Sequence, residues 1–150
     1  MIKFCFLLHD VENDAGELTI YVSFDGFSGK MSRFAGRAEL LRFASNIKDA
    51  VNLENGASIV YTTVFSDVGI DEQPQAQCTV ALSKFGQMDG VLIDVTIQDE
   101  VILGVASRKT ASTRVAFVST LAQIDKFATD IVDCKFSDEF NVSIHPFCDV

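Results

Sequence analysis

The chain contains no tryptophan, only two prolines and only two histidines among its 150 residues. Two prolines exclude a proline-rich linker that would divide the chain, and two histidines leave little material for a histidine-based metal site or general base. No apolar run approaches the length that crosses a membrane, and neither a Walker loop nor a G-x-S-x-G elbow occurs. We therefore expect no cofactor, no metal and no membrane partner.

Positive charge is scarce as well, because 12 basic residues stand against 21 acidic ones, for a formal net charge of −9. This balance argues against nucleic-acid binding through a basic surface. It favours a protein partner with a basic surface, although acidic charge also serves plain solubility. The hydrophobic fraction of 48%, with 13 phenylalanines, predicts an ordered core, and the length fits one domain.

The cysteines form no C-x-x-C pair of the kind that binds zinc or carries redox chemistry. There are four of them, at positions 5, 78, 134 and 148. The apolar N-terminal residues are interrupted by His9 and Asp10, so no secretory signal is expected. The sequence therefore predicts a cytoplasmic protein whose thiols are reduced and act as small buried hydrophobes.

The most informative feature that is present is an internal repeat. Residues 38–50, AELLRFASNIKDA, align with residues 122–134, AQIDKFATDIVDC, at an offset of 84. Both segments carry apolar residues at helical spacing. The predicted buried faces are Leu40, Phe43, Ala44, Ile47 and Val51 in the first helix and Ile124, Phe127, Ala128 and Ile131 in the second. The pair Thr120 and Gln123 forms a T-x-x-Q capping box, which aligns with the weaker pair Gly36 and Glu39.

Short alternating segments surround the two helices and are typical of half-buried strands. We expect strands at about 2–8, 17–24, 30–35, 57–65, 76–83, 90–97, 100–106, 113–118 and 140–144. Turn-like loops join them, so most pairings should be antiparallel. The predicted fold class is α+β, a curved, mostly antiparallel sheet of about eight strands with two helices on one face. One domain, 1–150, would consist of two similar halves, about 1–75 and 76–150, related by a pseudo-twofold axis. Chance similarity between two amphipathic helices is the alternative.

Three acidic loops are the candidate partner-binding residues. They are Asp10, Glu12 and Asp14 in the first, Asp67, Asp71 and Glu72 in the second, and Asp99 and Glu100 in the third. If they gather on one edge of the sheet, they form a docking site for a basic protein; otherwise they are three separate solvated turns. The first loop departs from a calcium loop because Tyr21 stands where a bidentate glutamate is needed.

Two other classes of function stay open. Cys5 and His9 lie four residues apart on a predicted strand and share a face, so either His9 or His145 could serve a small enzyme with a cysteine nucleophile. An exposed strand edge could instead let copies of the chain assemble, for example as a homodimer.

The segment from Leu18 to Val51 combines an alternating strand, the turn Gly26-Phe27-Ser28-Gly29, a short strand and a helix, and a second helix opens at 121–127. This order resembles the small bacterial immunity proteins of the WapI-like type, which are paired with wall-associated or contact-dependent toxins. The resemblance implies a cytoplasmic, non-enzymatic protein that binds and blocks a toxin domain. The acidic charge fits that implication, because many such toxins are basic nucleases.

Overall fold

The computed structural model describes residues 1–49, 51–65, 76–102 and 108–147. Its elements follow in the order β1 (Ile2–Asp10), β2 (Ala15–Phe24), β3 (Phe27–Gly36), α1 (Arg37–Lys48), α2 (Val51–Glu54), β4 (Ile59–Phe65), β5 (Ala76–Phe85), β6 (Gly90–Ile102), β7 (Arg108–Thr120), α3 (Leu121–Asp133) and β8 (Glu139–Ile144). The α+β class is confirmed, with two long helices and eight strands in the described part of the chain.

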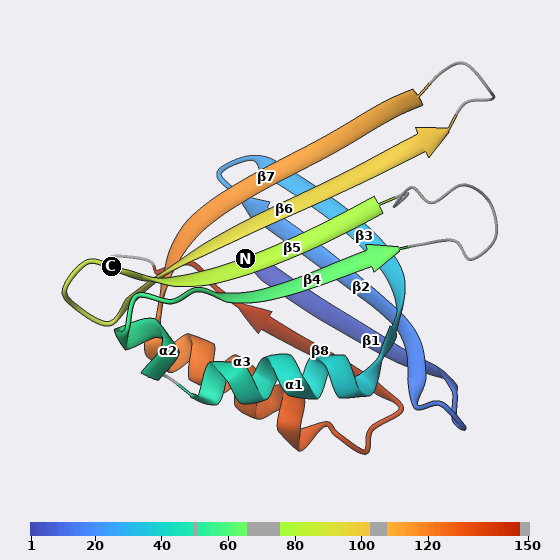
Figure 1. Ribbon diagram of the computed structural model, residues 1–150, viewed down its shortest axis with the longest axis horizontal. Helices are drawn as coiled ribbons and strands as arrows, with labels where there is room; N and C mark the ends of the chain where they lie inside the picture. The colour runs from blue at the N-terminus through green and yellow to red at the C-terminus, as the bar shows by residue number, and fades with distance from the viewer. Residues whose placement is uncertain (50, 66–75, 103–107, 148–150) are drawn as a thin grey trace.

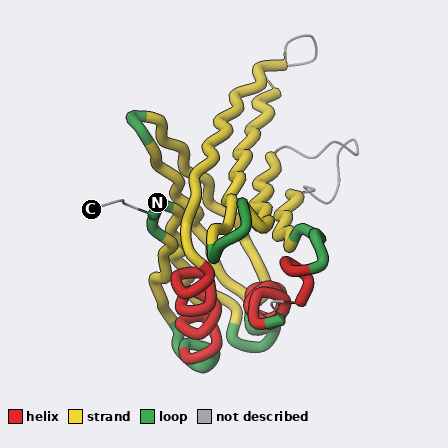
Figure 2. Tube along the Cα trace, turned by 90° about the vertical axis from the view of Figure 1, so that its left-hand side faces the viewer, coloured by secondary structure: helices red, strands yellow, loops and turns green. Residues whose placement is uncertain are grey.

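The eight strands form two sheets, so the expected single sheet is wrong. Sheet A has the order β3-β2-β1-β8 and sheet B the order β4-β5-β6-β7, and every neighbouring pair is antiparallel. Alternation along a strand shows that one face is buried, but not whether a helix or another sheet covers it. Here the core lies between sheet A and sheet B, which diverge toward the far ends of β6 and β7 (Figures 1 and 2).

The helices α1 and α3 lie side by side at the opposite end, between the sheets (Figure 2). The expectation that both cover one face of a single sheet is therefore wrong, since α1 contacts β3 and β4 whereas α3 contacts β7 and β8. We call β3–α1–β4 the first junction and β7–α3–β8 the second junction. The predicted apolar faces of both helices are buried, apart from Val51, whose side chain lies outside the description.

Four aromatic rings join both helices to both sheets. The Phe4 ring of β1 lies 5.3 Å from the Phe127 ring of α3 and 6.2 Å from the Phe43 ring of α1. The Tyr61 ring of β4 lies 5.1 Å from Phe43 and 5.7 Å from Phe4. Aromatic pairs at these separations are attractive beyond the apolar area that they bury, so this cluster fixes where each helix sits.

The two sheets follow one strand order. The strands β3, β2 and β1 of sheet A correspond to β7, β6 and β5, and β8 corresponds to β4, so sheet A has the order of sheet B read from its other edge. The offset of 84 also extends from the helices into the strands before them. It matches inward positions of β3 with inward positions of β7, namely Met31 with Val115, Arg33 with Phe117 and Ala35 with Ser119.

Strand boundaries differ from the prediction in the second half of the chain. The expected break between 90–97 and 100–106 is absent, because β6 runs unbroken to Ile102 and pairs with β7 along its whole length. The polar residues Gln98, Asp99 and Glu100 suggested a break, but a hairpin arm that leaves the core keeps its backbone ladder while its side chains become polar. After β8 the chain returns to sheet B, where the Phe147 N–H donates to the Val118 carbonyl at 2.7 Å.

Candidate functional site

The first predicted acidic loop forms the β1–β2 turn, and two of its three carboxylates have structural partners. Asp10 accepts hydrogen bonds from the Asn13 backbone N–H at 3.1 Å and from its side-chain amide at 2.7 Å. These bonds favour the ionised form and lower the pKa of Asp10. Asp14 accepts a hydrogen bond from the Arg37 Nε at 2.8 Å. Glu12 is exposed between them, so it is the carboxylate that the turn offers to a partner.

Arg37, at the start of α1, holds this turn against the connection between α3 and β8. Its side chain is only 3% exposed, and its Nη1 donates to the carbonyls of Cys134 at 3.2 Å and Ser137 at 2.6 Å. The guanidinium also lies 5.3 Å from the centre of the Phe6 ring. A buried arginine with this many partners joins the two connections into one rigid unit.

The joined connections form a surface that we call the acidic corner. It comprises Asp10, Val11, Glu12 and Asp14 from the β1–β2 turn and Asp133, Lys135, Phe136, Asp138 and Glu139 from the end of α3 to the start of β8. Val11 is 79% exposed and Phe136 is 88% exposed. Both connections are rich in carboxylates and lie at the lower right of Figure 1, and the Lys135 Nζ lies 5.2 Å from the centre of the Phe136 ring. Exposed aromatics with a polar surround are typical of the anchors of protein interfaces.

The other predicted acidic residues do not join this corner within the described chain. Asp67, Asp71 and Glu72 lie outside the described residues. Asp99 and Glu100 lie near the far end of β6, where the backbone of Asp99 is paired with both neighbouring strands. That end of β6 and the β1–β2 turn lie at opposite ends of the molecule in Figures 1 and 2.

The residues of the enzyme alternative are not brought together. Cys5 and His9 are four residues apart on β1, which is roughly 13 Å at the rise of a strand. Asn141 of β8 lies opposite Cys5. His145 follows four residues after Asn141, so it lies roughly 13 Å from Cys5 along the strand direction. A nucleophile and its base need hydrogen-bond contact. Burial raises the pKa of the Cys78 thiol to about 12, so this thiol carries no thiolate near neutral pH.

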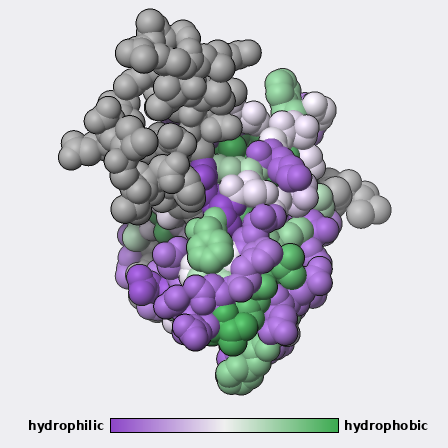
Figure 3. Space-filling model, turned by 90° about the vertical axis from the view of Figure 1, so that its right-hand side faces the viewer, coloured by the Kyte–Doolittle hydropathy of each residue, from purple (hydrophilic) through white to green (hydrophobic). Residues whose placement is uncertain are grey.

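A second candidate site is a groove of about 370 Å³ at the first junction. Its lining comes from three elements: Arg33 and Phe34 of β3; Glu39, Arg42, Phe43 and Asn46 of α1; and Val60, Tyr61 and Thr62 of β4. The α1 residues follow a spacing of three and four, which places them on one side of the helix. Figure 3 views the side of the molecule where β3 passes into α1 and shows hydrophilic side chains around hydrophobic ones.

Arg33 stands at an inward position of β3. Its neighbours at a spacing of two, Met31 and Ala35, are buried, and the residue opposite it on β2 is the fully buried Leu18. The Arg33 Nη2 lies 3.3 Å from the Met31 sulfur, and the guanidinium is close enough to act on the Cys78 thiol. A charged group on the core face of a strand is expensive to bury, and Arg33 lines the groove that opens beside it.

Tyr61 forms the floor of the groove. Among the described residues that line the groove, it has the only buried hydroxyl that lacks a hydrogen-bond partner. The side chain is 5% exposed, its ring packs against Phe4 and Phe43, and its hydroxyl has no hydrogen-bond partner among the described residues. Burial first, and Glu39 second, raise the pKa of this hydroxyl, so it stays a neutral donor. Leaving such a group unsatisfied costs about 1–3 kcal/mol. A native protein that bears this cost at the floor of a groove invites a functional explanation.

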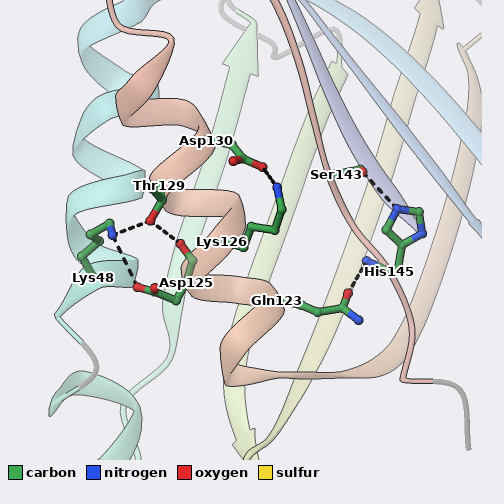
Figure 4. A network of polar contacts seen from close by, with 8 residues as sticks. All are labelled: Lys48, Gln123, Asp125, Lys126, Thr129, Asp130, Ser143 and His145. Carbon is green, nitrogen blue, oxygen red and sulfur yellow. Dashed lines mark hydrogen bonds and ion pairs between the residues drawn. The ribbon is translucent and has the colours of Figure 1, made fainter.

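The second junction has the same elements, but its polar groups are satisfied internally (Figure 4). Gln123, which aligns with Glu39, accepts hydrogen bonds from the His145 backbone N–H at 3.0 Å and the Ser119 hydroxyl at 3.5 Å. The Ser119 hydroxyl also donates to the His145 carbonyl at 2.6 Å. The Thr120 hydroxyl caps α3 as predicted, at 3.3 Å from the Gln123 N–H, while the Gln123 side chain turns toward the end of β8.

Sequence reasoning missed the residues that organise both sites. Arg37 carried no signal, because a basic residue beside a helix start is usually exposed. Arg33 did carry one, since it lies between Met31 and Ala35 in the alternation of a strand. In a strand, a residue with apolar neighbours two positions before and after it points into the core. This alternation was sufficient to place Arg33 on the inward face.

Comparison with known proteins gives no relative: no family model, no curated protein and no solved structure matches this chain. Within the described ranges, no group of three or more histidine, cysteine, aspartate or glutamate side chains could hold a metal ion. In the same part of the chain, no helix has the length and apolarity needed to cross a membrane. The arrangement of the acidic corner and of the groove therefore carries the functional interpretation.

Proposed function

We propose that the protein acts by binding a second protein with a basic surface, and that its specific role is immunity, the neutralisation of a cognate toxin domain in the cytoplasm. The carrying observation is the acidic corner, in which the exposed Phe136 and Val11 belong to two acidic connections that Arg37 joins. The likeness of the strand and helix order to WapI-like immunity proteins supports the specific role.

The corner combines the two features that protein recognition requires. A net charge of −9 attracts a basic partner over several ångströms and speeds encounter. The exposed Phe136 ring offers the apolar anchor that an interface buries at its centre. Because Asp10 and Asp14 have internal partners, the corner keeps its shape before the partner arrives, which lowers the entropy cost of binding.

The test is capture of a partner from bacterial lysate with the purified protein, washed in parallel at low salt and at about 1 M salt, where the Debye length falls to roughly 3 Å. We expect one basic protein that is retained at low salt and released at high salt. Titration of that protein then gives the affinity of each variant. Failure to retain any basic protein at low salt would contradict the proposal.

Matched variants locate the interface. Phe136→Ala should weaken binding at least tenfold, because an anchoring aromatic contributes about 2 kcal/mol or more. Glu12→Lys should slow association and reduce its salt dependence. The control is Met88→Ala in the β5–β6 turn, which removes an apolar side chain that is 84% exposed beside the exposed Asp89. Equal losses for Phe136→Ala and Met88→Ala would mean that the corner is not the interface.

We also infer that the two halves arose by duplication and are related by a pseudo-twofold axis. The support is the shared strand order of the two sheets and the single offset that aligns the inward positions of β3 and α1 with those of β7 and α3. Duplication with later divergence leaves one copy free to acquire a binding role while the other keeps a structural one.

A further inference from the structure

We propose that the groove of the first junction binds a carboxylate group. This inference is separate from the proposed interface, because the groove is defined by Arg33, Glu39, Arg42 and Tyr61 and shares no residue with the acidic corner. The ligand chemistry follows from the donors that line the groove, from the single acidic group among them, and from the hydroxyl at its floor.

The donors fit a planar anion. A guanidinium presents its N–H groups in a rigid fork that matches the two oxygens of a carboxylate, and the groove contains two, from Arg33 and Arg42. Arg42 is exposed and makes no ion pair with any residue that the structure describes. The Tyr61 hydroxyl, which has no partner in the described chain, would donate to the same oxygen pair, and the Asn46 amide adds a further donor.

Glu39 limits the charge of the ligand. Glu39 is the one acidic side chain among the described residues that line the groove. Its carboxylate repels the additional negative charge of a phosphate more strongly than the single charge of a carboxylate ligand, and such repulsion is the usual way in which a site rejects a near analogue. The raised pKa of Tyr61 is consistent with this role, because a phenolate would repel every anion.

Entry to the floor requires a side chain to move. The Tyr61 hydroxyl is buried, whereas Phe34 and Arg42 are exposed at the rim. Exposed side chains change rotamer within nanoseconds, so the rim opens without any change of the backbone. A carboxylate that binds there breaks no internal hydrogen bond of the described chain, because the Tyr61 hydroxyl has none to lose.

The chain contains only two tyrosines, which makes a direct test simple. Labelling tyrosine with ¹³C at Cζ gives two NMR signals, and Tyr61→Phe identifies the one from the groove. Tyr21, on the outer face of sheet A beneath Lys30, is the internal control. The probes are sodium acetate, N-acetyl-glutamate α-amide, its neutral analogue N-acetyl-glutamine amide, and inorganic phosphate at equal ionic strength.

We expect the Tyr61 signal to shift saturably with acetate, with a Kd on the order of 1–10 mM for a ligand of this size, while the Tyr21 signal stays still. Arg42→Gln should weaken this binding about tenfold or more. Lys126→Gln, the matched change at the aligned position of α3, should leave it unchanged. Glu39→Gln should tighten acetate binding and should allow phosphate to bind.

The two carboxylate probes also distinguish between the possible sources of the carboxylate. Binding of N-acetyl-glutamate α-amide at least tenfold tighter than acetate would identify an acidic side chain of a polypeptide, and equal binding would identify a free carboxylate. The proposal is overturned if neither carboxylate shifts the Tyr61 signal saturably, if N-acetyl-glutamine amide shifts it equally, or if phosphate binds more tightly than acetate to the unchanged protein. None of these results depends on whether a toxin partner is found.

Discussion

The two junctions use the same strand, helix and strand, yet one is open and the other is closed. At the second junction Phe117 is buried at the position that Arg33 occupies in the first, and Gln123 is bound by the chain that follows β8. At the first junction the aligned residue, Glu39, lines a groove of about 370 Å³ whose floor is the unpartnered hydroxyl of Tyr61.

The difference shows how few residues separate a closed junction from an open one. The packed face of the helix is common to both junctions, because Phe43 and Phe127 meet the same Phe4 ring. The positions around this face differ, as Arg33 against Phe117 and Glu39 against Gln123 show. Lys126 is held by Asp130 on its own helix, whereas Arg42 faces the groove. The two junctions therefore share their aromatic packing and differ in the residues around it.

The largest expected effect tests the aromatic packing that the two junctions share. Phe43→Ala and Phe127→Ala should each lower the free energy of unfolding by about 3–5 kcal/mol, because both rings are buried and leave a cavity. Urea unfolding of the two variants measures the effect. Similar losses would show that the helices pack equivalently, and a near-neutral change at either position would break the comparison.

The next effect separates the junctions. Arg37→Met should cost about 2–3 kcal/mol, because the bonds to Asp14 and to the Cys134 and Ser137 carbonyls are lost. The matched control on the same helix is Arg42→Met, which is exposed and should stay within about 0.5 kcal/mol. Thermal unfolding of both variants compares them, and equal stabilities would show that Arg37 does not hold the acidic corner.

A smaller effect sharpens the contrast between the aligned residues Gln123 and Glu39. Gln123→Ala should cost about 1 kcal/mol, because the His145 N–H loses its acceptor. Glu39→Ala should change stability by less than about 0.5 kcal/mol, since Glu39 is exposed. Chemical denaturation of the two variants gives both values. A larger loss for Glu39→Ala would contradict the view that the second junction is closed and the first is open.

The sequence predicted the local elements better than their assembly. The apolar spacing that defines the faces of α1 and α3 depends on neighbouring residues, so Leu40, Phe43, Ile124 and Phe127 were placed correctly. Assembly into two sheets depends on which strands meet, and each strand alternates in the same way whether a helix or a sheet covers it. The pattern along the chain therefore could not distinguish one sheet from two.

The sequence predicted candidate site residues only where they lie together in one turn. Glu12 and its neighbours could be proposed from the sequence because acidic residues gather in one stretch of it. Phe136 and Arg37 were missed, because the corner that they complete joins residues about 100 positions apart, as the bond from Arg37 to Ser137 does. The groove was missed for the same reason, since β3, α1 and β4 contribute to it only after folding.

The most direct measurement of the difference between the junctions is the stability of Tyr61→Phe by urea unfolding without added ligand. Removing a buried hydroxyl that has no partner should raise the free energy of unfolding by about 1 kcal/mol, while the ring keeps its contacts with Phe4 and Phe43. A loss of about 1 kcal/mol would show that the hydroxyl is already satisfied within the protein, and would contradict the open groove.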